Sequence, residues 1–280
     1  MKLGNFEIIV LKESPMWLDG GAMFGVVPKT IWSQWCIPDN LNRIEIAVKS
    51  LLIITSDNKK ILIDTGNGNK FNEKQKTIYG IDGNRTILTA LKEKNISPEE
   101  INIVINTHLH FDHCGGNTIY DSQGKPIPAF PNAIYIIQRG EYDYATLKAY
   151  KDKASYMKEN YEPLMETGQL KLIDGDTSIV EGLKVKVTSG HTKHHQIVLI
   201  ESQEQKAILW GDIMCMTPFI KPKYTSAFDL YPLDTVNIKK KLLGMTIEEN
   251  YISIFNHDPQ TDFAKITFDG KDYQNIPIPE

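Results

Sequence analysis

The chain has 280 residues, which is enough for one large domain or two small ones with a sizeable core. Hydrophobic residues make up 41% of it and charged residues 24%, the composition of an ordinary globular protein. The net charge of −4 and the lack of a basic insertion argue against a nucleic-acid partner, and no stretch reaches the roughly 18 apolar residues of a membrane helix. We therefore expect neither a nucleic-acid nor a membrane partner.

In chain order, apolar periodicity predicts strands at 44–55 and 60–64, a helix at 85–94, a second helix start at 97–100, strands at 101–106 and 133–138, a helical stretch at 139–167, strands at 183–188, 196–202 and 207–210, a helix at 235–247 and a last strand at 251–255. The first two strands are joined at Asp57-Asn58, a typical hairpin turn, and Asn84 is the expected N-cap of the first helix. Strands dominate both halves and helices intervene. The fold class is therefore α/β with mixed sheets.

The cysteines and the amino terminus indicate where the protein resides. The three cysteines, Cys36, Cys114 and Cys215, are odd in number and far apart, which argues against a disulfide framework. Residues 1–14 show a short β-like run without the apolar region or cleavage site of a signal peptide. We expect a reduced, cytoplasmic protein. No repeat, low-complexity tract or Ser/Gly linker divides the chain, so one domain over residues 1–280 is expected.

Four candidate metal ligands lie within six residues, directly after the strand expected at 101–106: His108, His110, Asp112 and His113. Residues two apart in an extended chain point the same way, so His108 and His110 can converge on one ion. A turn after His110 would send Asp112 and His113 toward a second ion. Imidazole nitrogen and carboxylate oxygen suit zinc, and also iron, manganese or cobalt. A polar turn with incidental histidines is the alternative, and it is disfavoured because three of only seven histidines fall here.

Three further candidates follow expected strands. His191 comes after strand 183–188, Asp212 after strand 207–210, and His257 after strand 251–255. Functional side chains are commonly carried on loops at the ends of rigid elements, so we expect these residues to join the metal centre. Of the remaining histidines, His195 either supports a ligand as a hydrogen-bond donor or is structural, and for His194 a surface position is favoured.

The sequences HLHFDH at 108–113, GHT at 190–192, GD at 211–212 and the late His257 occur in this order and resemble the metallo-β-lactamase superfamily. The resemblance implies a four-layer αββα sandwich with the site along one edge. It also implies that His108, His110 and His191 hold one metal ion, that Asp112, His113 and His257 hold the other, and that Asp212 bridges them. The turn at 64–66 is similar to the family's early Asp-containing turn, whose carboxylate orients a ligand histidine.

Residues 18–29 resemble the opening of a branch of quorum-quenching N-acyl-homoserine lactonases that is related to methyl parathion hydrolase. The functional interpretation of this segment is an apolar wall over the metals, with Met23, Phe24 and Val26 facing an acyl chain. The alternative is a Gly-rich turn packed for structural reasons. Trp32 early in the chain, and Phe219, Tyr224 and Phe228 after Asp212, are further apolar side chains expected at the rims of the site.

The chain departs from these relatives at two places. Many lactonases of this fold carry a tyrosine three residues after the bridging Asp, and Cys215 stands there; a thiol is a weak donor. Tyr224 or Tyr231 is the candidate to replace that hydroxyl, and Tyr224 is our predicted catalytic residue. The family pattern GHTPGH also loses its Pro and Gly at 193–194. Cys114 is either a thiolate ligand or a small buried residue before the Gly115-Gly116 turn, and the second interpretation is favoured.

The expected function is a dinuclear-metal hydrolase that opens a lactone or ester, an N-acyl-homoserine lactone first of all, by attack of a metal-bridging hydroxide. Two divalent ions, with zinc expected first and iron, manganese or cobalt as alternatives, lower the pKa of the attacking water. Asp112 and Asp212 orient this water and shuttle its proton. The alternatives are organophosphate or aryl-ester hydrolysis on the same site, and an iron-dependent redox enzyme such as a persulfide dioxygenase or a flavodiiron protein. The expected partner is a small acyl lactone or ester. The sequence leaves open whether the protein forms a homodimer.

Overall fold

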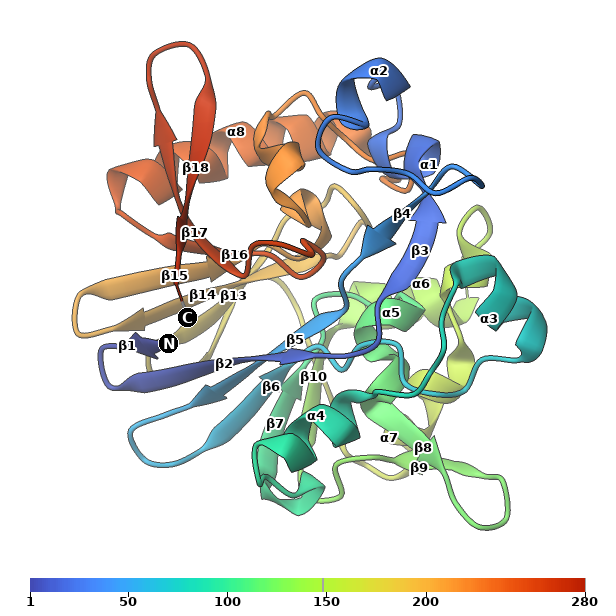
Figure 1. Cartoon of the computed structure of the whole chain (residues 1–280). Coiled ribbons are helices and arrows are strands. Elements are labelled where there is room, and N and C mark those ends of the chain that lie inside the picture. Colours follow the sequence, from blue (N-terminus) through green and yellow to red (C-terminus); the bar gives the residue numbers. More distant parts are fainter. Residues whose placement is uncertain (148, 280) are drawn as a thin grey trace. The chain divides into compact units, whose positions relative to one another are not determined.

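The structure is a computed structural model that describes residues 1–147 and 149–279 (Figure 1). The chain divides into two compact units. The first comprises Met1–Ser14 and Val48–Gly175, and the second comprises Pro15–Ala47 and the chain from Asp176 onward. Each unit contains one seven-stranded mixed sheet, so the predicted α/β class with two mixed sheets is confirmed. One domain over residues 1–280 stays a prediction.

The sheet of the first unit joins antiparallel and parallel strands. Its order is β1 (Lys2–Leu3), β2 (Phe6–Lys12), β5 (Lys49–Ile54), β6 (Lys60–Ile63), β7 (Ile101–Ile105), β10 (Ile134–Gln138) and β11 (Leu170–Ile173). Pairing is antiparallel from β1 to β6 and parallel from β6 to β11. The predicted hairpin joins β5 to β6, with Asn58 at a φ of 63°, a left-handed conformation that Asn tolerates.

Helices of the first unit cover its sheet or carry the ligand loop. They are α3 (Glu73–Tyr79), α4 (Ile87–Glu93), α5 (Phe111–Cys114), α6 (Arg139–Leu147) and α7 (Glu162–Glu166), with the 3₁₀ turns η1 (Pro98–Glu100), η2 (Gly115–Asn117), η3 (Lys153–Ser155) and η4 (Lys158–Asn160) and the small sheet β8 (Thr118–Tyr120) and β9 (Pro126–Pro128). α4 packs against β2 and buries Leu91 in one cluster with Leu62 and Val104. The predicted helix is confirmed, but its N-cap is Thr86 rather than Asn84. The second helix, predicted to start at Ser97, is only the single 3₁₀ turn η1, because β7 begins directly after it.

The helical stretch expected over 139–167 is wrong as one element, and its residue 148 lies outside the described residues. α6 ends at Leu147, two 3₁₀ turns follow, and α7 restarts with Pro163 in its first turn. Proline suits a first turn because its missing N–H has no partner there in any case. Two tyrosines of this stretch direct their hydroxyls to carboxylates, Tyr144 to Asp152 at 2.8 Å and Tyr156 to Glu141 at 2.9 Å.

The sheet of the second unit is antiparallel except for one pair. Its order is β12 (Thr177–Val180), β13 (Leu183–Val187), β14 (Gln196–Ser202), β15 (Gln205–Leu209), β16 (Ile252–Ile254), β17 (Phe263–Phe268) and β18 (Tyr273–Ile278), with β15 and β16 parallel. α8 (Pro232–Glu248) links that pair and packs against β17. β16 was expected to be the last strand, which is wrong, because the hairpin β17–β18 follows it. None of the described helices is long and apolar enough to cross a membrane.

The second unit also takes in a segment from the first part of the chain, which forms β3 (Met16–Asp19), α1 (Gly20–Phe24), α2 (Lys29–Trp32) and β4 (Arg43–Ile46). The run 44–55, expected to be one strand, is divided between β4 and β5, because the chain passes from the second unit to the first after Ala47. Two 3₁₀ turns, η5 (Gly211–Met214) and η6 (Thr217–Ile220), lie between β15 and α8.

Candidate metal centre

In the first unit, the ligand loop leaves the buried strand β7 and leads into α5. His108, His110 and His113 are buried, and Asp112 is partly exposed. The ring centroid of His108 lies 4.5 Å from that of His110 and 4.1 Å from that of His113. Each of these four side chains belongs to a group of His and Asp residues that could hold a metal ion. The structure therefore brings together the four local residues that the spacing argument selected.

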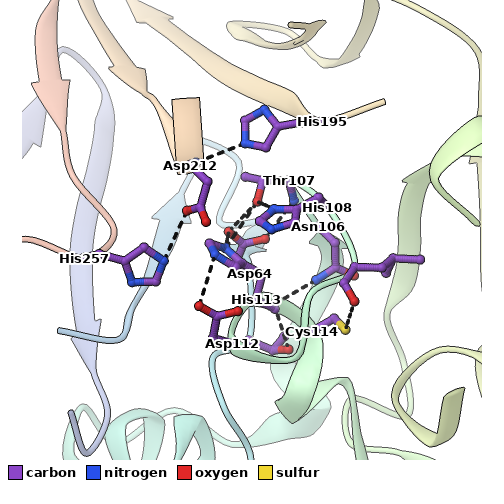
Figure 2. Close-up of polar contacts among 12 residues, drawn as sticks. Asp64, Asn106, Thr107, His108, Asp112, His113, Cys114, His195, Asp212 and His257 are labelled. Atoms are coloured by element: carbon purple, nitrogen blue, oxygen red, sulfur yellow. Dashed lines mark hydrogen bonds and ion pairs between the residues drawn. The ribbon is translucent and has the colours of Figure 1, made fainter. Parts of the chain in front are cut away.

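A carboxylate and a hydroxyl engage the outer ring nitrogens of this loop. Nδ1 of His113 lies 2.9 Å from Oδ2 of Asp64, and Nδ1 of His108 lies 3.1 Å from Oγ1 of Thr107. Figure 2 shows Asp64 between Thr107 and His113, and Thr107 donates to it from its backbone N–H at 2.8 Å and its hydroxyl at 2.9 Å. Engaging Nδ1 leaves Nε2 of both histidines as the ligand atom. Asp64 thus contacts a ligand histidine, as the family resemblance implied.

The backbone around Asp64 is held against the end of the ligand loop. Thr65 donates its N–H to the carbonyl of His113 at 2.8 Å, and a Cβ at Gly115 would lie 2.0 Å from the carbonyl oxygen of Asn67. Only glycine permits so close an approach of two backbones. Cys114 is fully buried, its thiol donates to the carbonyl of Leu109 at 3.3 Å, and it joins none of the candidate metal groups within the described part of the chain. These contacts agree with the favoured interpretation of Cys114 as a small buried residue.

His110 faces a carboxylate with its other ring nitrogen, at a distance longer than the contacts of His108 and His113. Its Nε2 lies 3.5 Å from Oδ2 of Asp152, which also accepts at Oδ1 from the hydroxyl of Tyr144 at 2.8 Å. Burial raises the pKa of Asp152, but the contacts with His110 and Tyr144 outweigh it and hold that pKa below its ordinary value. No sequence pattern singled out Asp152, because it lies 42 residues after His110 in a region expected to be helical.

In the second unit, one carboxylate lies between two histidines. Oδ2 of Asp212 is 3.3 Å from Nε2 of His191, and Oδ1 is 3.2 Å from Nε2 of His257 (Figure 2 shows the second pair). The outer nitrogens are engaged here too: Nδ1 of His191 lies 3.0 Å from Asp229, and Nδ1 of His257 lies 2.8 Å from the carbonyl of Ala47. All three side chains belong to candidate metal groups. Sequence reasoning missed Asp229, which has no motif around it.

His195 supports the backbone of Asp212. It is fully buried, its Nε2 accepts from the N–H of Asp212 at 3.1 Å (Figure 2), and its Nδ1 lies 2.7 Å from the hydroxyl of Thr188. An accepting Nε2 requires the proton on Nδ1. His195 thus supports a ligand residue, as one of the two interpretations held, but as an acceptor rather than a donor. His194 is only partly exposed.

The aromatic residues expected along the rims of the site are largely core residues of the second unit. The ring of Phe24 stacks on Trp32 at 5.5 Å and on Phe219 at 5.0 Å between centroids, and all three rings are buried. Met23 is 5% exposed, whereas Val26 is 88% exposed, so the two do not form one wall. Packing of Phe24 agrees with the structural alternative, as does Asp19, which caps α1 by accepting from the N–H of Ala22 at 2.8 Å, and the acyl-chain contact stays a prediction.

The structure places Tyr224 against Trp35, with ring centroids 5.8 Å apart, and its carbonyl accepts from the ammonium of the buried Lys239 at 2.6 Å. Its predicted catalytic role stays a prediction. Tyr231 lies under the ammonium of Lys193, 5.2 Å from its ring centroid. Cys215 is buried, and burial together with the charge of Asp212 raises the pKa of its thiol.

The residues present fit divalent cations. Five histidines have one ring nitrogen within 3.5 Å of an oxygen of the protein, so that the other nitrogen can serve as a ligand: His108, His110, His113, His191 and His257. This outer contact fixes the ring and the tautomer, as it does around metal sites in general. Together with the carboxylates of Asp112 and Asp212, each unit supplies nitrogen and oxygen ligands suited to zinc and to other first-row metals.

Known proteins match the chain in sequence and in structure. A curated N-acyl homoserine lactonase of Bacillus cereus is 31% identical over 175 residues, which is 61% of this chain and 62% of that protein. A solved structure described as a probable metal-dependent hydrolase from Staphylococcus aureus is 32% identical, covers 100% of this chain and 99% of its own, and has a TM-score of 0.91. A solved N-acyl homoserine lactone hydrolase with N-hexanoyl-L-homoserine bound at its catalytic metal centre is 25% identical, with coverages of 93% and 95% and a TM-score of 0.67.

The match to the curated lactonase spans less than two thirds of that protein's length. These relatives are hydrolases or lactonases by name, which agrees with the predicted enzyme class and with the predicted lactonase-like branch. The family model described as the Metallo-beta-lactamase superfamily matches residues 45–245, which is well over half of the chain. The chain therefore belongs to the Metallo-beta-lactamase superfamily and has its fold, as predicted.

Proposed function

We propose that this chain is a two-metal hydrolase that opens a lactone or an ester, with an N-acyl-homoserine lactone as the first substrate to test. The observation that carries the proposal is the carboxylate of Asp212, which lies 3.3 Å from His191 and 3.2 Å from His257 and so offers one oxygen to each of two ions. Membership of the family and the similarity to lactonases support the choice of reaction.

The proposed ligand sets are those that the family resemblance implies. His108, His110 and His191 would hold one ion, Asp112, His113 and His257 would hold the other, and Asp212 would contribute to both. Zinc is the ion that we expect, because these ligands are imidazoles and carboxylates; iron, manganese and cobalt accept the same donors.

Two divalent ions at such a centre would acidify a water molecule and polarise the substrate carbonyl. The protein's own part is to orient the groups and to move protons. The side chains of Asp112 and Asp212 keep 12% and 14% of their surface exposed, so water reaches both carboxylates. Either can orient that water and accept its proton, and later return the proton to the departing alkoxide.

Tyr224 is proposed as the hydroxyl donor to the substrate, because Cys215 stands where many lactonases carry tyrosine. Its replacement by Phe should lower kcat with little change in metal content. Tyr231→Phe tests the other candidate hydroxyl, and Tyr120→Phe, at an exposed tyrosine of β8, is the control. Wild-type kcat in Tyr224→Phe would remove Tyr224 from the mechanism.

The proposed setting is a reduced cytoplasm, which agrees with three free cysteines in the structure. The proposed partner is a small acyl lactone or ester. A homodimer remains the alternative to a monomer, and sedimentation of the purified protein distinguishes the two.

The test joins metal analysis to a substrate panel. We expect two equivalents of divalent metal per chain, and kcat/KM higher for N-acyl-homoserine lactones than for an aryl ester or an aryl phosphotriester. Protein stripped with a chelator and then reloaded is the control. Preferred turnover of the phosphotriester would replace the lactonase proposal with an organophosphate hydrolase. One equivalent of iron without hydrolysis of any ester would instead favour a redox enzyme.

A further inference from the structure

A carboxylate outside the proposed ligand set lies against His110. Oδ2 of Asp152 is 3.5 Å from Nε2 of His110, and the two side chains are only 10% and 8% exposed. The hydroxyl of Tyr144 donates to Oδ1 of the same carboxylate at 2.8 Å. Asp152 thus has one oxygen toward the imidazole and the other held by a tyrosine.

The same part of the chain holds the backbone next to His110. The hydroxyl of Tyr156 donates to Oε1 of Glu141 at 2.9 Å, and the N–H of Leu109 donates to that oxygen at 3.1 Å. The ring of Tyr156 also meets the ring of His110 edge-on, with centroids 4.9 Å apart. The position and the rotation of the His110 ring are therefore both defined by α6 and the segment that follows it.

The position of the carboxylate determines which nitrogen of His110 can bind a metal. A carboxylate beside Nε2 favours the proton on that nitrogen, and the lone pair that a metal ion needs is then on Nδ1. His108 and His113 have the opposite arrangement, because their Nδ1 atoms are the engaged ones. A ligand histidine that has lost its outer partner can rotate and change tautomer, and it binds metal less tightly.

We propose that Asp152, held by Tyr144, is the positioning residue of His110 and sets the affinity of the metal ion that His110 binds. The proposal rests on the metal centre of the proposed function. It does not concern the ligands themselves, since Asp152 joins none of the candidate metal groups found among residues 1–147 and 149–279.

A purely structural role is the competing explanation, in which Asp152 only accepts from Tyr144 and closes the turn after α6. Asp152→Asn separates the two, because the amide has the same shape and still offers Tyr144 an acceptor oxygen, while the charge facing His110 is gone. Tyr144→Phe perturbs the same pair from the other side. Asp143→Asn is the matched control, since Asp143 is an exposed carboxylate on α6 itself.

The experiment measures Zn²⁺ affinity of the metal-free proteins by competition with a chromophoric chelator, alongside urea unfolding of the same samples. We expect Asp152→Asn to lower the affinity for one of the two ions by about 10- to 100-fold and to leave the affinity for the other ion unchanged. Tyr144→Phe should lower the affinity for the same ion by a smaller factor, and Asp143→Asn should bind both ions as tightly as the wild type. The unfolding free energy of the metal-free Asp152→Asn variant should stay close to that of the wild type.

Wild-type affinity for both ions in Asp152→Asn overturns the proposal. If that variant is too unstable to load, unchanged affinities in Tyr144→Phe overturn it instead. A wild-type protein that binds a single ion contradicts the two-metal function. In that case Asp152→Asn should still lower the affinity for the single ion, and an unchanged affinity overturns the role of Asp152.

Discussion

Replacing Asp64 with Asn should lower both the stability of the metal-free protein and its affinity for metal. The carboxylate is buried and accepts three contacts, from the N–H of Thr107 at 2.8 Å, from its hydroxyl at 2.9 Å and from Nδ1 of His113 at 2.9 Å. Asparagine keeps the shape, and it also tolerates the left-handed φ of 58° at this position. It has one acceptor oxygen instead of two charged ones, so at most part of this set survives.

A hydrogen bond to a charged group contributes about 1.5–3 kcal/mol, so we expect the metal-free Asp64→Asn protein to lose on the order of 3 kcal/mol of unfolding free energy. Because His113 loses the contact of its Nδ1 with the Asp64 carboxylate, the affinity for the metal ion that His113 binds should fall by about 10- to 100-fold. Urea unfolding and chelator competition measure the two effects. Asp57→Asn, at an exposed carboxylate of the β5–β6 hairpin, is the control. An Asp64→Asn protein that holds both ions as tightly as the wild type would refute the reasoning.

Three further variants test other parts of the structure. Asp212→Ala should abolish binding of at least one ion and reduce turnover by several orders of magnitude while circular dichroism is unchanged; near-normal turnover would show that Asp212 is not the bridge. Phe24→Ala removes a ring stacked between Trp32 and Phe219, so it should cost about 3–5 kcal/mol of stability without changing metal content, and a loss below 1 kcal/mol would contradict that packing. Burial lowers the pKa of Lys239 to about 8, so between pH 8 and 10.5 the unfolded chain binds more protons than the folded one and stability rises with pH. Relative to Lys239→Met, the metal-free wild type should therefore gain about 2 kcal/mol from pH 7.5 to 9.5 in urea unfolding, and parallel pH curves would contradict the shift.

The candidate ligands could be picked out from the sequence because their signals are local. His108, His110, Asp112 and His113 are neighbours in the chain, and each later candidate follows a recognisable apolar strand. The strands themselves followed from apolar runs, as at 196–202, which is the observed range of β14. Elements with mixed composition were missed, and β17–β18 is the clearest case, although the Asp269-Gly270 dipeptide at its turn was an available signal.

The residues that support the ligands could not be predicted, because they are distant in sequence and chemically ordinary. Asp229 lies 38 residues from His191, and the carbonyl of Ala47 lies 210 residues from His257. A backbone carbonyl has no sequence signature at all. The buried position of Phe24 could not be predicted for a related reason: an apolar residue has the same sequence signal in a core as at the rim of a substrate site, and only packing distinguishes the two.

The ligand loop and the Asp152 segment should exchange their amide hydrogens on different timescales. The loop continues from β7, which pairs with a strand on each side, and residues 104–118 are buried apart from Asp112. Opening there requires the sheet to come apart, so exchange should report global unfolding. The segment 149–155 has no buried residue and only a 3₁₀ turn, so it should open locally. The alignment of His110 is then lost far more often than the backbone that carries it.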